Sequence, residues 1–115
     1  MAVQRYPAMK VDHIQEGVER RQGHTENLMM TILDFYNGPQ DEPDPPHAHP
    51  HEQISYVAEG AIFFFLEGQC ERLGAGDMFL APSGKKHSIQ LLTEHVRLVD
   101  CFYPIREDFL NVVHS

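Results

Sequence analysis

His47-Ala48-His49-Pro50-His51-Glu52-Gln53 is the segment that says most about the architecture and chemistry of this chain. Alternate residues of an extended strand point to the same face, so we expect His47, His49 and Gln53 to share one face. A later segment, Gly76-x5-Pro82-x-Gly84-x2-His87, brings a fourth donor, His87, from a partner strand. Neutral imidazole is the commonest protein ligand for transition metals. The two segments therefore predict a site for one divalent transition metal, and this donor set suits Zn, Mn, Ni, Fe or Co alike.

A second register of the same segment uses His49 and His51 as the first two ligands. The next donor would then fall on Ser55, whose hydroxyl is a poor metal ligand. The register with His47 and His49 places Gln53 at the third ligand position instead. His51 is then expected near the rim of the site, where it supports a ligand or faces solvent.

Short apolar runs separated by glycine-marked turns follow one another through the chain. No long helical periodicity interrupts them, so they predict an all-β barrel or sandwich. The expected strands are Leu28–Tyr36, Gln53–Ala58, Ala61–Leu66, Gln69–Leu73, Met78–Ala81, His87–Leu92 and Val96–Tyr103.

The length of 115 residues predicts a single domain, with an N-terminal arm over about 1–27, a barrel over about 28–103 and a tail or short helix over about 104–115. The net charge of -8 argues against a nucleic-acid partner but allows a small anionic substrate beside a local arginine. We expect no membrane partner, because no run approaches the ~20 apolar residues of a membrane span. The N-terminus does not resemble a signal peptide, and Cys70 and Cys101 are expected to be free thiols, so the predicted location is cytoplasmic.

Three residues at the end of the last expected strand and just beyond it form a second group of candidate site residues. Asp100 and Phe102 alternate to the same face. If that face lines the barrel interior, Asp100 is a candidate general acid or base and Phe102 a platform for a substrate ring. Arg106 follows closely, and its planar fork suits a substrate carboxylate. The alternatives are an Asp100 that points to water or pairs with Arg97, a Phe102 that only packs in the core and a surface Arg106 paired with Glu107 or Asp108.

The chain resembles the cupin superfamily through two motifs. The first is H-x-H-x3-(E/Q)-x6-G, at His47, His49, Gln53 and Gly60, and the second is G-x5-P-x-G-x2-H, at Gly76, Pro82, Gly84 and His87. Eight residues rather than five separate the introductory Gly38 from the first histidine, and Leu91 stands where the second motif has Asn. Neither departure affects a ligand. The resemblance implies a double-stranded β-helix, also called a jelly roll.

Gln53 stands where many cupins have Glu. A neutral amide leaves the metal its full charge, which strengthens its action as a Lewis acid and disfavours a ferric state. The further pattern D-x-F-x3-R, at Asp100, Phe102 and Arg106, resembles the KdgF-type cupins of uronate catabolism. That resemblance implies ring opening or tautomerisation of an unsaturated uronate from pectin or alginate, with His47, His49, Gln53 and His87 as metal ligands and Asp100, Phe102 and Arg106 at the reaction site.

We therefore expect a metal-dependent isomerase or lyase whose partner is a small, carboxylated substrate. The alternatives are a cupin dioxygenase, a polyketide-cyclase-like cupin and a cupin that binds a small molecule without turnover. Ser55 shares the face of Gln53 and is predicted to line the pocket and contact the substrate. The run Ile62–Leu66 is apolar on both faces, so its outer face is expected to meet a second subunit of a homodimer or the N-terminal arm.

Overall fold

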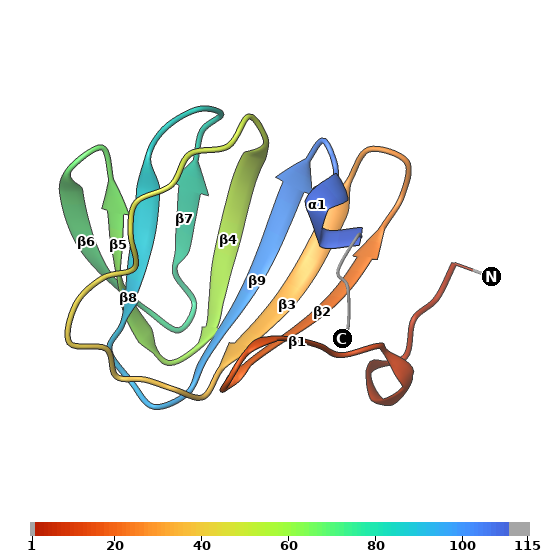
Figure 1. Ribbon diagram of the computed structural model, residues 1–115, viewed down its shortest axis with the longest axis horizontal. Helices are drawn as coiled ribbons and strands as arrows, with labels where there is room; N and C mark the ends of the chain where they lie inside the picture. Colours follow the sequence, from red (N-terminus) through yellow and green to blue (C-terminus); the bar gives the residue numbers. More distant parts are fainter. Residues whose placement is uncertain (1, 111–115) are drawn as a thin grey trace.

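Strands make up most of the structure, a computed structural model that describes residues 2–110 (Figure 1). A short 3-10 helix η1 (Tyr6–Ala8) precedes the first strand, and a single helical turn α1 (Glu107–Leu110) follows the last. The strands are β1 (Asp12–Gln15), β2 (Val18–His24), β3 (Met29–Phe35), β4 (Glu52–Glu59), β5 (Ala61–Leu66), β6 (Gln69–Gly74), β7 (Met78–Ala81), β8 (His87–Leu91) and β9 (Val96–Tyr103). All seven strands expected from the sequence are present, with ends that differ by at most one residue.

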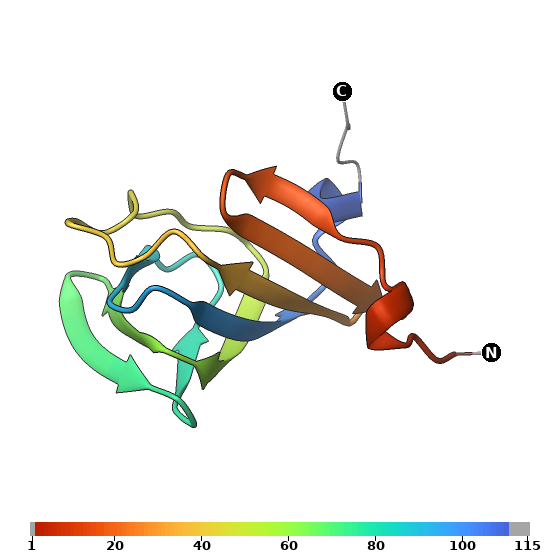
Figure 2. The same ribbon diagram turned by 90° about the horizontal axis from the view of Figure 1, so that it is seen from below.

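Two antiparallel sheets make up the fold. The larger has the strand order β1-β2-β3-β9-β4-β7 and the smaller β6-β5-β8. Non-consecutive neighbours such as β3 and β9 give the crossed connections of a jelly roll, and the view from below shows the smaller sheet facing part of the larger one (Figure 2). The prediction of an all-β jelly roll is confirmed.

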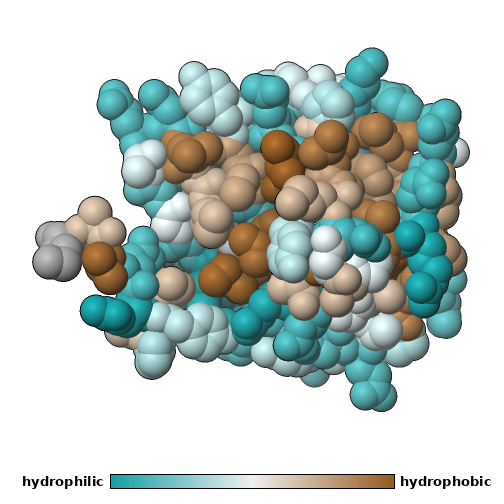
Figure 3. Space-filling model, turned by 180° about the vertical axis from the view of Figure 1, so that it is seen from behind, coloured by the Kyte–Doolittle hydropathy of each residue, from teal (hydrophilic) through white to brown (hydrophobic). Residues whose placement is uncertain are grey.

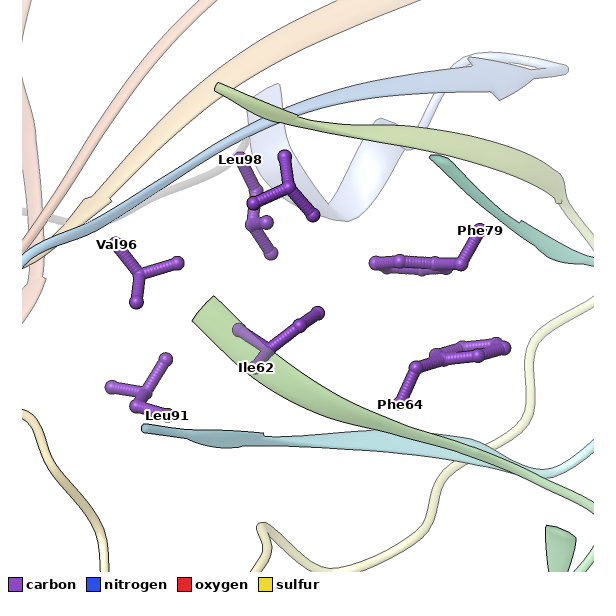
Figure 4. Close-up of a cluster of buried hydrophobic side chains, with 7 residues drawn as sticks. Ile62, Phe64, Phe79, Leu91, Val96 and Leu98 are labelled. Atoms are coloured by element: carbon purple, nitrogen blue, oxygen red, sulfur yellow. The ribbon is translucent and has the colours of Figure 1, made fainter. Parts of the chain in front are cut away.

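The hydrophobic core lies between the two sheets. Its buried members are Val57, Ile62, Phe64, Phe79, Leu91, Val96 and Leu98. The rings of Phe64 and Phe79 stack with centroids 4.2 Å apart and join the two sheets directly (Figure 4). Apolar residues alternate with outward-facing ones along these strands, which is the pattern that a half-buried sheet requires. Two members of this core, Phe79 and Leu98, also line a cavity inside the barrel.

The first part of the chain differs from the sequence-based expectation. Residues 1–27 were predicted as an arm, but β1 and β2 extend the larger sheet, and β2 pairs with β3 over seven residues from Val18↔Phe35 to His24↔Met29. The inward face of β2 carries Val18 and the buried Arg20, whose guanidinium lies 3.7 Å from the carboxylate of the buried Asp12 on β1. A buried ion pair hides the apolar alternation by which such strands are recognised.

Part of the outer face of the larger sheet, over β4, β7 and the neighbouring ends of β3 and β9, is apolar. Its large side chains, each between 41% and 62% exposed, are Leu28, Met30, Ile54, Tyr56, Met78, Leu80 and Tyr103. We call these residues the apolar sheet face. Figure 3 shows brown, hydrophobic side chains gathered across the middle of the molecule on the side opposite to the view of Figure 1. By contrast, Phe63 and Phe65 on the outer face of β5 are only partly exposed and contact each other with ring centroids 6.4 Å apart.

No helix within residues 2–110 is both long and apolar enough to cross a membrane.

Candidate metal centre

His47 and His87 are joined through their backbones. The amide of His47 donates to the carbonyl of His87 at 3.0 Å, and the amide of His87 donates to the carbonyl of His47 at 2.9 Å. His47 and His49 do not lie on a regular strand as predicted, because the pair His47↔His87 is an isolated bridge and β4 begins only at Glu52. Pro46 and Pro50 have no N–H group to donate to a sheet ladder, which explains the irregular backbone.

The three histidine rings nevertheless converge. Their centroids are 5.7 Å apart for His47 and His49, 4.4 Å for His47 and His87, and 4.9 Å for His49 and His87. One ligand nitrogen from each ring lies within 4.8 Å of the other two. His49 and His87 are buried, at 8% and 4% exposure, while His47 lies at the exposed side of the cluster.

The outer nitrogens of these rings are held by backbone carbonyls. Nδ1 of His49 lies 2.8 Å from the carbonyl of His51, and Nδ1 of His87 lies 3.1 Å from the carbonyl of Lys85. A carbonyl only accepts, so Nδ1 carries the proton and each Nε2 keeps a lone pair for a metal. Burial also lowers the pKa of His47 and His87 and so favours the neutral ligand form. Nε2 of His87 is buried and has no hydrogen-bond partner among the described residues.

Gln53 completes the cluster from β4. Its amide Nε2 donates to Oγ of Ser55 at 2.9 Å, and Ser55 in turn donates to Oδ1 of Asp100 at 2.5 Å. Since Asp100 accepts from Ser55, the hydroxyl oxygen is the acceptor for Gln53, and this fixes which end of the amide is which. Oε1 of Gln53 therefore points at the histidines and lies 3.1 Å from Nε2 of His49.

Two acceptors that face each other at 3.1 Å repel unless a cation holds both. Neighbouring ligands that each lie about 2.1 Å from one metal, at a right angle, are about 3 Å apart. The separation of Gln53 and His49 thus fits a shared metal ion, as does the orphaned Nε2 of His87. A set of three imidazoles and one amide oxygen suits a divalent transition metal and leaves positions for a substrate.

A cavity of about 350 Å³ opens in front of this cluster. The sequence-predicted site residues His47, Gln53, His87, Asp100, Phe102 and Arg106 all line it. Asp100 is 3% exposed, and burial raises its pKa to about 6, although the hydrogen bond from Ser55 and the charge of Arg106 act in the opposite direction. A carboxyl group with such a pKa can both release and take up a proton near neutral pH.

Two predicted substrate contacts are placed differently from expectation. Ser55 was expected to contact a substrate, but it is 0% exposed and does not line the cavity. It instead links Gln53 and Asp100 by hydrogen bonds. Arg106 lines the cavity, but its Nε and Nη2 donate to the carboxylate of Asp108 at 3.0 and 2.8 Å. The guanidinium of Arg106 is therefore paired with Asp108, which is one of the alternatives that the sequence left open.

Among the cavity-lining residues that sequence reasoning did not single out, two lie against each other. Arg20 of β2 and Phe109 of α1 both contribute to its wall, and the guanidinium of Arg20 lies 4.0 Å from the centroid of the Phe109 ring. The one signal in the sequence is that Val18 and Arg20 are two residues apart, so on a strand whose Val18 faces inward Arg20 faces inward as well.

Comparison with known proteins agrees with this fold. A family model described as a cupin domain matches residues 37–102, which is more than half of the chain. The chain belongs to the cupin family.

Within this family, the pectin degradation protein KdgF of Dickeya dadantii is 34% identical over 101 residues, which are 86% of this chain and 89% of that protein. The structure of KdgF from a Halomonas species has a TM-score of 0.81 at 33% identity and covers 90% of this chain and 94% of that one. An RmlC-like cupin from Shewanella frigidimarina has a TM-score of 0.83 at 33% identity, over 92% and 93% of the two chains.

Proposed function

We propose that this cupin is a metal-dependent enzyme that opens the ring of, or tautomerises, an unsaturated uronate released from pectin or alginate. The observation that carries the proposal is that His47 and His87 of the three-histidine cluster line one cavity together with Gln53, Asp100 and Arg106, in a chain similar to KdgF over most of its length. A divalent metal bound by His47, His49, Gln53 and His87 would supply a Lewis acid that polarises a substrate oxygen.

The remaining residues of the cavity have separate tasks in this proposal. Asp100 transfers a proton to or from the substrate, since its pKa of about 6 lets it work in both directions near neutral pH. Phe102 is 2% exposed and offers an apolar wall against which a sugar ring packs. Arg106 adds positive charge beside that wall, with its guanidinium carbon 5.3 Å from the centroid of the Phe102 ring.

The direct test uses 4,5-unsaturated monouronates. Ring opening or tautomerisation removes the double bond conjugated with the carboxylate, so ultraviolet absorbance falls as the reaction proceeds. We expect the metal-loaded protein to accelerate this loss above the spontaneous rate and His49→Ala to abolish the acceleration. Equal rates with and without the protein would contradict the proposal. Oxygen consumption with an aromatic or thiol substrate would support a dioxygenase instead.

We also propose that two copies pair through the apolar sheet face, in a cytoplasmic homodimer. Side chains as apolar as Ile54, Met78 and Leu80, each at least half exposed, are unusual in such a group on a monomer. A flat apolar face can complement itself across a two-fold axis. The free thiols Cys70 and Cys101 support a reducing compartment.

Light-scattering mass measurements test the pairing. Wild type should have the mass of a dimer, and Ile54→Lys should reduce it to that of a monomer. Phe63→Lys, on the outer face of β5, should leave the dimer intact. Dissociation by Phe63→Lys alone would place the interface on the smaller sheet, and a monomeric wild type would contradict pairing altogether.

A further inference from the structure

The cavity contains a second buried guanidinium. Arg20 projects from β2 and is 5% exposed, and its Nε has no hydrogen-bond partner among the residues that the structure describes. Two contacts of its Nη2 are long, at 3.7 Å to the Asp12 carboxylate and 3.4 Å to the carbonyl of Phe109. A buried donor without a partner is costly, which is why such groups deserve an explanation.

Arg106 offers less to a ligand than Arg20 does. Two of its nitrogens are already paired with Asp108, whereas Arg20 lines the cavity wall and its buried Nε has no hydrogen-bond partner among the described residues. Both guanidiniums lie against the ring of Phe109, with their carbons 4.0 Å (Arg20) and 4.3 Å (Arg106) from its centroid. Figure 1 shows α1, which carries Phe109, in front of the strands of the larger sheet.

We propose that Arg20 is an anion contact of this cavity and that its guanidinium binds the carboxylate of the substrate. This role rests on the proposed function, because it assigns the carboxylate of a sugar acid to a particular residue. A charge-assisted hydrogen bond from a guanidinium to a carboxylate is among the strongest that proteins make.

The position of Arg20 also restricts the size of the ligand. β2 and β4 are three strands apart in the sheet, and the register places Arg20 level with Val57, four residues along β4 from Gln53. The backbones of Arg20 and Gln53 would therefore lie roughly 20 Å apart along a flat sheet and lie closer across a concave one. An oxygen at the histidine cluster and a carboxylate at Arg20 must therefore belong to opposite ends of the ligand. A hexuronate has this form, and a two- or three-carbon acid does not.

The test compares galacturonate, a stable uronate, with galactose, its neutral counterpart, on the metal-loaded protein. We expect Arg20→Gln to weaken binding of galacturonate about tenfold or more in calorimetry, with galactose binding changed less than about twofold. The KM for an unsaturated uronate should rise by a similar factor, with a smaller change in kcat. Arg21→Gln is the matched control, because Arg21 is the next residue on β2, points to the opposite face towards Glu19 and Asp34, and should leave galacturonate binding unchanged.

Two further measurements separate a binding role from a structural one. Arg20→Lys keeps the charge but loses the planar fork, so it should weaken galacturonate binding even where its melting temperature equals that of wild type. In wild type, the Nε–H nuclear magnetic resonance signal of Arg20 should shift with galacturonate and not with galactose. Unchanged galacturonate affinity in Arg20→Gln or Arg20→Lys, or an unmoved Nε–H signal, overturns the role of Arg20 while turnover of unsaturated uronates still supports the enzyme. A wild type that neither binds nor converts uronates overturns both.

Discussion

Gln53 and His49 face each other through Oε1 and Nε2 at 3.1 Å, although both atoms are acceptors. The hydrogen bonds behind each residue impose this arrangement, from Nδ1 of His49 to the carbonyl of His51 and from Gln53 to Ser55. The site is thus prepared to hold a cation by contacts on the far side of its ligands.

Replacing Ser55 with Ala should weaken metal binding although Ser55 does not touch the metal. The amide of Gln53 would lose the acceptor that fixes its orientation, and its NH2 end could turn to the histidines. Loss of such a supporting contact typically costs about 10- to 100-fold in metal affinity. A chelator competition titration with Zn²⁺ measures the change in metal affinity. Ser83→Ala is the control, because it removes an exposed hydroxyl that donates to the carbonyl of Pro50. Equal affinity in wild type and Ser55→Ala would show that the amide needs no such support.

Asp100→Asn should retain the metal and lose most turnover of an unsaturated uronate. The amide has nearly the shape of the carboxyl group but cannot transfer a proton at neutral pH. Full activity in Asp100→Asn, at unchanged metal content, would remove Asp100 from the reaction.

The same substitution should change how stability depends on pH. Burial raises the pKa of Asp100 from 3.8 to about 6, so the folded state binds this proton more tightly than the unfolded state does. Stability from this group is complete below pH 3.8, falls as the pH rises towards 6 and levels off above it, a loss of about 3 kcal/mol. Urea unfolding of the metal-free protein should show this fall in wild type and not in Asp100→Asn. Parallel pH profiles would contradict the assignment.

Asp34 on the outer face of β3 should stabilise the fold in the opposite pH range. It is 0% exposed, and although burial opposes ionisation, hydrogen bonds from Arg97 and His95 lower its pKa below the ordinary value. Its contribution is therefore present above about pH 4 and lost as the pH falls through the lowered pKa. Asp34→Asn should destabilise the protein by about 3 kcal/mol at pH 7, whereas Asp41→Asn, in an exposed loop, should change stability by less than about 0.5 kcal/mol. A difference between Asp34→Asn and wild type that does not shrink in acid would contradict this pH dependence.

Much of the fold could be predicted from the sequence because the barrel strands obey simple rules. β9 is mostly apolar, and β5 is a continuous apolar run between glycine-marked turns. The spacing of His47, His49 and His87 follows the two cupin motifs, which place these residues at one site. What escaped prediction depends on tertiary contacts. The inward face of β2 does not read as apolar because it carries Arg20, which lies 3.7 Å from the carboxylate of Asp12 on β1. For Arg106, the sequence left open a substrate carboxylate or a neighbouring acid as the partner, and the structure pairs it with Asp108. Ser55 could be assigned to the correct face from alternation, but its zero exposure depends on the packing of neighbouring strands.

The central claim, that this cupin holds a metal at the histidine cluster, is tested most directly by metal content. Plasma mass spectrometry of protein purified without chelator should find about one divalent transition metal ion per chain. His49→Ala and His87→Ala should lose the ion, while His24→Ala, an exposed histidine at the end of β2, should keep it. Metal-free wild type, or a metal that survives both substitutions, would contradict the account.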